Sequence, residues 1–162
     1  MNRRRGMTMN DAIYYEDVVP GRTLKVGPYH VAKEEVMEFS RKWNPLPFHI
    51  DEAAAKATIY GGLTAPGIYT LAVRTMLLDR LPMLEAMLGT VVWDDVRFQK
   101  PVRPGDDLRV EMEWLEKRMA KSKPDRGLVK MRITVLNQHD EPVMSQFDTI
   151  MMRLRQPGAG TE

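Results

Sequence analysis

The feature that most constrains the fold is a single apolar segment followed by a long series of strand-like segments. Residues 68–81 are mostly apolar, and a helix that is apolar on several sides has to be buried. A further helical stretch is expected up to Leu88. Beyond it, β-branched and aromatic residues dominate four segments separated by polar turn sequences, which are 90–102, 108–119, 128–137 and 143–154. A buried helix followed by a meander of strands requires the sheet to wrap around the helix.

The first third of the chain predicts one strand and two helices. Residues 24–31 have the composition of a strand, and a helix is expected from Ala32 until Pro45 disfavours its continuation at Asn44. The two prolines in residues 44–48 predict a stiff, irregular loop that carries His49. Asp51 is expected to cap the helix that follows it.

Together these segments predict an α+β fold of the hot-dog type, in which a long apolar helix is wrapped by an antiparallel sheet. With 162 residues the chain is long enough for one such domain, expected over residues 14–155. Residues 1–13 and 156–162 are expected to be flexible tails.

Composition excludes several classes of protein. The absence of cysteine excludes disulfides, zinc–thiolate sites and a cysteine nucleophile, and a net charge of +2 is too small to indicate nucleic-acid binding. No apolar run is long enough to span a membrane, and none follows the basic N-terminus as in a secretory signal, so we expect a cytoplasmic protein. No ligand cluster for a metal is visible, since His49 and Asp51 alone are too sparse. Acid–base chemistry near neutral pH has only His30, His49 and His139 as candidates.

Two stretches are more specific than these patterns. The first is Trp43-Asn44-Pro45-Leu46-Pro47-Phe48-His49, continuing to Gly61-Gly62-Leu63-Thr64-Ala65-Pro66-Gly67. The second is Val96-Arg97-Phe98-Gln99-Lys100-Pro101-Val102-Arg103-Pro104-Gly105-Asp106-Asp107-Leu108. In this order they resemble the signatures of the MaoC-like dehydratase family, of the (R)-specific enoyl-CoA hydratase type, over about residues 14–154.

The resemblance implies hydration of a trans-2-enoyl-CoA to the (R)-3-hydroxyacyl-CoA, or the reverse dehydration, without a cofactor. In this family an Asp and a His share one water, and a backbone N–H at the start of the buried helix holds the thioester oxygen. His49 matches the catalytic histidine, and Gly67 matches the glycine that polarises the thioester. Both matches are chemically reasonable, because an imidazole can take and return a proton and a helix start has unpaired N–H groups. Without the motif, the simpler interpretations are a packed loop histidine and an ordinary helix-start glycine.

Asn44 is the main departure, because it occupies the position of the family's catalytic Asp. A carboxamide can orient a water molecule but cannot exchange a proton. Another alignment of the Trp-Asn-Pro-Leu run places Lys42 there, and neither alignment recovers the Asp. Asp51 is close in sequence, although a helix N-cap is its simpler role.

Four further residues are expected to contact the substrate. They are Phe48, Gly62, Pro66 and Tyr69, with Pro66 replacing the family's His or Ser, and with loop shape or packing as the alternative roles of Gly62 and Tyr69. Tyr60 could line a tunnel for the acyl chain, although simple packing is its alternative role. Arg97, Lys100 and Arg103 could meet coenzyme A phosphates, although a solvated charged face is the simpler explanation.

Two other functions remain open. The substitution at Asn44 favours a non-catalytic acyl-CoA-binding subunit that works beside an active partner. A hot-dog thioesterase would need a carboxylate on the buried helix or a nearby loop, and the helix offers only Asp79 near its end. A homodimer is expected in each case, or a hetero-oligomer with a second hot-dog subunit, because pairing closes the open sheet edge and the acyl groove.

Overall fold

A computed structural model describes residues 12–156 of the chain. They form a five-stranded antiparallel sheet with strand order β1-β3-β4-β5-β2. The elements are a short 3-10 helix η1 (Tyr15–Asp17), β1 (Thr23–His30), α1 (Lys33–Trp43), α2 (Pro47–Ile50), α3 (Glu52–Lys56), α4 (Gly67–Leu78), β2 (Met87–Phe98), β3 (Asp107–Met119), β4 (Arg126–Leu136) and β5 (Pro142–Arg153).

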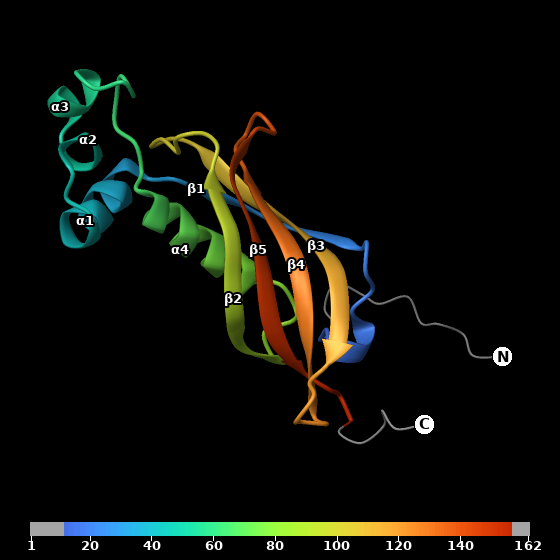
Figure 1. Ribbon diagram of the computed structural model, residues 1–162. Coiled ribbons are helices and arrows are strands. Elements are labelled where there is room, and N and C mark those ends of the chain that lie inside the picture. Colours follow the sequence, from blue (N-terminus) through green and yellow to red (C-terminus); the bar gives the residue numbers. More distant parts are fainter. Residues whose placement is uncertain (1–11, 157–162) are drawn as a thin grey trace.

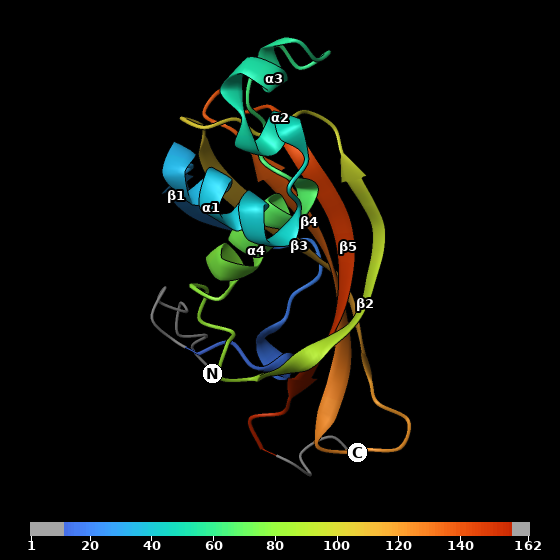
Figure 2. The same ribbon diagram turned by 90° about the vertical axis from the view of Figure 1, so that its left-hand side faces the viewer.

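The sheet curves around α4, which lies along its concave face (Figures 1 and 2). Helix α4 buries Tyr69, Val73 and Leu77 against this face. Helices α1, α2 and α3 are gathered beyond the N-terminal end of α4, away from most of the sheet (Figure 1). This is the predicted hot-dog arrangement, a single layer of strands wrapped around one buried helix.

Alternation of side chains along the strands explains why the sheet has one buried face. Successive residues of a strand point to opposite faces, so every second residue can be apolar. Most buried residues of β3 and β4 follow this rule, and Leu136 at the end of β4 departs from it. The alternating apolar residues are Leu108, Val110, Met112, Trp114, Val129, Met131, Ile133 and Val135. The opposite face carries polar pairs such as Lys25 on β1 with Glu111 on β3, whose Nζ and Oε1 atoms lie 2.9 Å apart.

The structure corrects three expectations about local structure. The proline-rich segment is not entirely irregular, because Pro47–Ile50 forms a short helix with proline at its start, where a missing N–H costs nothing. The helical stretch expected up to Leu88 is instead a series of turns over residues 82–86, and β2 begins at Met87. Ile13, expected within the tail, is 2% exposed and donates its N–H to the Pro82 carbonyl at 2.6 Å.

The capping role of Asp51 is confirmed. Its Oδ1 accepts the backbone N–H groups of Ala53 at 2.8 Å and Ala54 at 3.0 Å, which fixes the start of α3 directly after His49 and Ile50. The remaining residues of the expected tails, 1–11 and 157–162, lie outside the described residues.

Strand β2 forms one edge of the sheet and exposes an unusual amount of apolar surface. Five of its residues are between 37% and 53% exposed, and they are Val91, Val92, Trp93, Val96 and Phe98. An unpaired edge that also carries apolar side chains is a surface that proteins normally cover. Within residues 12–156, no helix has the length and apolar character needed to cross a membrane.

Candidate functional site

A cavity of about 510 Å³ lies beside the N-terminal end of α4. Its lining residues come from α2, the loop after α3, the start of α4, the end of β2 and the segment that leads to β3. They are Phe48, His49, Tyr60, Thr64, Ala65, Gly67, Thr70, Phe98, Gln99, Lys100, Pro101 and Val102. The two motifs of the sequence therefore meet around one cavity, which is the candidate active site.

His49 lies in the wall of this cavity with a defined hydrogen-bond partner. It is only 6% exposed, and its Nδ1 atom lies 2.6 Å from the backbone carbonyl oxygen of Thr64. A carbonyl oxygen only accepts hydrogen bonds, so Nδ1 carries the proton and the neutral ring keeps its lone pair on Nε2. The ring of Phe48 packs edge-on against the imidazole, with 4.4 Å between ring centroids. The hydrogen bond and the ring packing thus fix the tautomer of the neutral imidazole and its orientation in the cavity wall.

Backbone hydrogen bonds join the histidine segment to the loop that supplies this carbonyl. The N–H of Thr64 donates to the carbonyl of Phe48 at 3.2 Å, and the N–H of Ala65 donates to the carbonyl of Val102 at 2.8 Å. Thr64 is 2% exposed and Ala65 is 8% exposed. The loop before α4 is therefore hydrogen-bonded on one side to the segment that carries His49 and on the other side to the second motif.

Gly67 is the first residue of α4, as predicted, and Pro66 is the N-cap residue before it. The first N–H groups of a helix have no acceptor within the helix, and the helix dipole favours negative charge at this end. A Cβ atom on Gly67 would lie 2.7 Å from Cζ of Phe98, so the aromatic ring packs directly on the glycine. Only glycine fits here without moving that ring, and Gly67 is one of the residues that line the cavity.

The structure brings three of the predicted site residues together and leaves four outside the cavity lining. Phe48, His49 and Gly67 line the cavity, whereas Asn44, Gly62, Pro66 and Tyr69 do not. The roles of all seven in binding or catalysis remain predictions.

Each of the four has a definite place. Asn44 is the C-cap residue of α1, and its backbone N–H donates to Ser40. Tyr69 is 1% exposed and packs edge-on against Phe39. Burial raises the pKa of its phenol well above the ordinary value. Pro66 caps α4, and Gly62 lies beside the guanidinium of Arg103.

Several wall residues received no role from the sequence. Thr64 orients the histidine, Thr70 lies one helical turn after Gly67, and Phe98 covers that glycine. Thr64 and Phe98 belong to the two motifs, so the motifs could have indicated them. Thr70 is identified only by its position on the buried helix, where a polar residue is unexpected.

The cavity wall contains no aspartate or glutamate within the part of the chain that the structure describes. The Asp51 carboxylate is engaged in capping α3, and Asp79 is the C-cap of α4, at the helix end opposite Gly67. Lys100 lines the cavity and its ammonium group pairs with Glu141. Among residues 12–156, no group of three or more His, Asp or Glu side chains could hold a metal ion. Among the described residues that line the cavity, His49 is the only histidine.

Comparison with known proteins supports this description. The family model described as "MaoC like domain" matches residues 7–136. The structure of a MaoC-like dehydratase from Rhodospirillum rubrum superposes with a TM-score of 0.82 and 31% identity, covering 90% of this chain and 99% of that one. The R-hydratase PhaJ1 of Pseudomonas aeruginosa gives a TM-score of 0.70 and 26% identity, covering 93% and 97%.

A more distant structure agrees on the fold alone. A Mycobacterium tuberculosis protein described as having a double hot-dog fold gives a TM-score of 0.77 with 17% identity. The match covers 93% of this chain and 47% of that one.

Proposed function

This chain belongs to the MaoC-like domain family, and from that premise we propose that it hydrates an enoyl-CoA thioester to the (R)-3-hydroxyacyl-CoA, or catalyses the reverse dehydration. The observation that supports this proposal most directly is the shared cavity. It holds an imidazole with a fixed tautomer and the free N–H end of a buried helix. A base and an oxyanion donor facing one space are what addition of water to a conjugated thioester requires.

In the proposed reaction, Nε2 of His49 takes a proton from water while the oxygen attacks C3 of the enoyl group. The electrons of the double bond move towards the thioester, and the N–H of Gly67 stabilises the resulting negative charge on the carbonyl oxygen. The proton is then delivered to C2 from the imidazolium, so one water is added overall. The family resemblance gives Asn44 only the role of orienting the water, because a carboxamide cannot exchange the proton; the structure places it outside the cavity lining.

The test follows the loss of enoyl absorbance with crotonyl-CoA and longer trans-2-enoyl-CoA substrates. We expect His49→Ala to abolish turnover, and Asn44→Asp to raise it by supplying the missing carboxyl group. His30→Ala is the matched control, because His30 is exposed and pairs with Asp107 on the sheet. Turnover by the His49→Ala variant at the wild-type rate would overturn the proposal.

A second function is favoured by the absence of any carboxylate from the described cavity wall. In this alternative the domain binds acyl-CoA without turnover and acts beside a catalytic partner subunit. Acyl-CoA binding measured by calorimetry, with no turnover in the wild type or in Asn44→Asp, would support it. A thioesterase is less well supported, because Asp79 lies at the opposite end of α4 from the cavity.

We also propose that the chain assembles as a dimer, or with a second hot-dog subunit, through β2. This edge strand exposes Trp93 at 49% and Phe98 at 53%, and Phe98 also lines the cavity. A partner strand there would bury the apolar edge and close the open side of the cavity. Sedimentation analysis should show a dimer that Trp93→Glu dissociates; a monomeric wild type at micromolar concentration would contradict the proposal.

A further inference from the structure

Arg103 lies in the second motif, and its side chain contacts the loop before α4. These contacts indicate a role that the proposed function does not include. Its guanidinium donates from Nη2 to the carbonyl of Tyr60, and Nη1 lies 3.5 Å from the carbonyl of Leu63. Its own backbone N–H is held by Asp106 Oδ2 at 2.8 Å. Within residues 12–156 the side chain makes no ion pair with a carboxylate, so its hydrogen bonds go to the loop backbone.

These contacts lie immediately next to the carbonyl that orients the histidine. The clamped carbonyls belong to Tyr60 and Leu63, and the next carbonyl along the chain, that of Thr64, contacts His49 Nδ1 at 2.6 Å. A displaced Leu63 carbonyl would rotate the peptide unit that follows it. The geometry of the arginine and the tautomer of the histidine are therefore coupled through one short stretch of backbone.

The contacts of Arg103 with the carbonyls of Tyr60 and Leu63 form a clamp on this loop, and Gly62 leaves room for it. A Cβ atom at Gly62 would lie 3.3 Å from Nη1 of Arg103, closer than most real Cβ contacts. Glycine at this position lets the guanidinium approach the loop, and the planar fork can reach two carbonyls at once. A lysine ammonium is a point charge on a flexible stem and cannot reproduce both contacts.

We propose that Arg103 is a positioning residue for His49. By fixing the loop over residues 60–63, it holds the Thr64 carbonyl on the Nδ1 proton and keeps Nε2 as the basic nitrogen. The structural part of this inference concerns the imidazole alone; only its effect on rate depends on the proposed hydratase function.

The test measures the tautomer of His49 directly, by ¹⁵N NMR of the histidine side chains. Only three histidines are present, so His30 and His139 serve as internal references. We expect the neutral ring to be the Nδ1–H form in the wild type and to shift towards a mixture of tautomers in Arg103→Met. Arg103→Lys should shift it similarly, although the charge is kept. Gly62→Ala perturbs the same contacts by crowding the guanidinium, and we expect a smaller change in the tautomer populations. This variant provides the test if the arginine variants do not fold.

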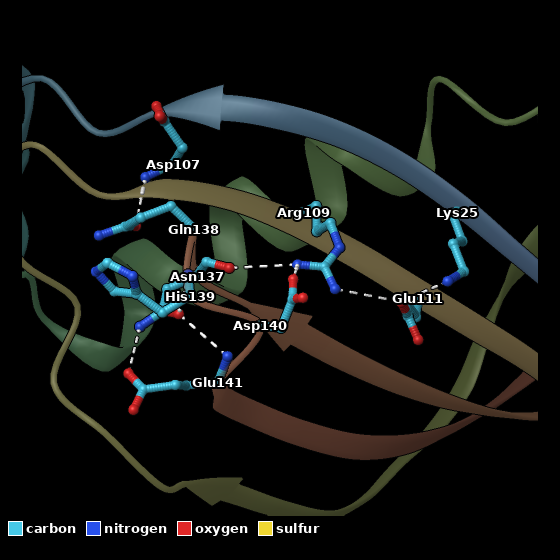
Figure 3. A network of polar contacts seen from close by, with 9 residues as sticks. All are labelled: Lys25, Asp107, Arg109, Glu111, Asn137, Gln138, His139, Asp140 and Glu141. Atoms are coloured by element: carbon cyan, nitrogen blue, oxygen red, sulfur yellow. Dashed lines mark hydrogen bonds and ion pairs between the residues drawn. The ribbon is translucent and has the colours of Figure 1, made fainter.

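Arg109→Met is the matched control. Like Arg103, Arg109 donates to a loop carbonyl, that of Asn137 at 3.3 Å, and Figure 3 shows this contact beside His139. Unlike Arg103, it also forms ion pairs with Asp140 and Glu111. Its loss should affect the signals of His139 and leave those of His49 unchanged. A His49 tautomer that is unchanged in both Arg103→Lys and Gly62→Ala would overturn the inference, whatever the activity.

Activity then separates this inference from the proposed function. If the chain is a hydratase, loss of the clamp should lower kcat by up to about 100-fold with a smaller change in KM, as expected for a misplaced base. If the wild type shows no turnover, the proposed function fails while the tautomer measurement still supports or overturns the clamp.

Discussion

The buried ion pair between α4 and β5 gives the sharpest prediction about stability. Arg74 and Asp148 have side chains that are 3% and 2% exposed, and the guanidinium donates from Nη2 to Oδ2 of the carboxylate. Gln146 donates to the other oxygen, Oδ1, and Trp93 lies with its ring centroid 5.2 Å from the guanidinium carbon. Removing the cation alone leaves a carboxylate without its counter-charge in the core.

We expect Arg74→Met to lower the free energy of unfolding by about 3–5 kcal/mol, the usual cost of breaking a buried pair. A domain of this size has roughly 5–15 kcal/mol in total, so the variant should remain only marginally folded. The double variant Arg74→Met/Asp148→Leu should be more stable than Arg74→Met, because two apolar side chains replace the pair. It should still lie about 1–3 kcal/mol below the wild type, because the amide of Gln146 loses its acceptor.

The assay is urea unfolding followed by circular dichroism. The wild type, Arg74→Met, Asp148→Leu and the double variant form the thermodynamic cycle. A loss below about 1 kcal/mol in Arg74→Met, or additive effects in the double variant, would refute the reasoning.

Three further predictions concern local contacts. Asp51→Ala should cost about 1 kcal/mol in urea unfolding, because two N–H groups at the start of α3 lose their acceptor. Gly67→Ala should lower kcat/KM with crotonyl-CoA, since its Cβ would displace the ring of Phe98, and Gly67→Ala/Phe98→Leu should recover part of the loss. Lys25 holds the pKa of Glu111 below its usual value; the resulting stabilisation is present above the unfolded-state pKa and disappears as the pH falls through the folded-state pKa. Lys25→Met should therefore be less stable than the wild type at neutral pH and equal to it in acid, as urea unfolding at both pH values will show.

Most of the fold could be predicted because burial determines the spacing of apolar residues. Alternation along β3 and the apolar character of α4 both follow from packing against one core, and both are visible in the sequence. The two prolines predict an irregular loop, whereas the structure has the short helix α2 there, because proline is tolerated at the first position of a helix. No sequence pattern indicates the ion pair of Arg74 with Asp148, because the two residues are far apart in the chain and only the packing of α4 on the sheet brings them together.

The candidate site could be predicted only where a motif supplied it. His49 and Gly67 are recognisable because their stretches resemble the family signature, and the structure places both at one cavity. The hydrogen bond from His49 to the Thr64 carbonyl has no signature in the sequence, because any residue can supply a backbone carbonyl. The same holds for the clamp on the carbonyl of Tyr60, which depends on how the loop folds against Arg103.

The lack of a carboxylate in the described cavity wall has a kinetic consequence that tests the proposed reaction. If His49 both removes the proton from water and returns it to C2, one group carries the proton throughout turnover. The pH profile of kcat/KM should then show a single ionisation instead of the bell shape produced by two groups. Asn44→Asp adds a second proton-exchanging group and should introduce a second ionisation into the profile. Two ionisations in the wild-type profile would show that another side chain shares the proton transfer, and the mechanism through His49 alone would have to be abandoned.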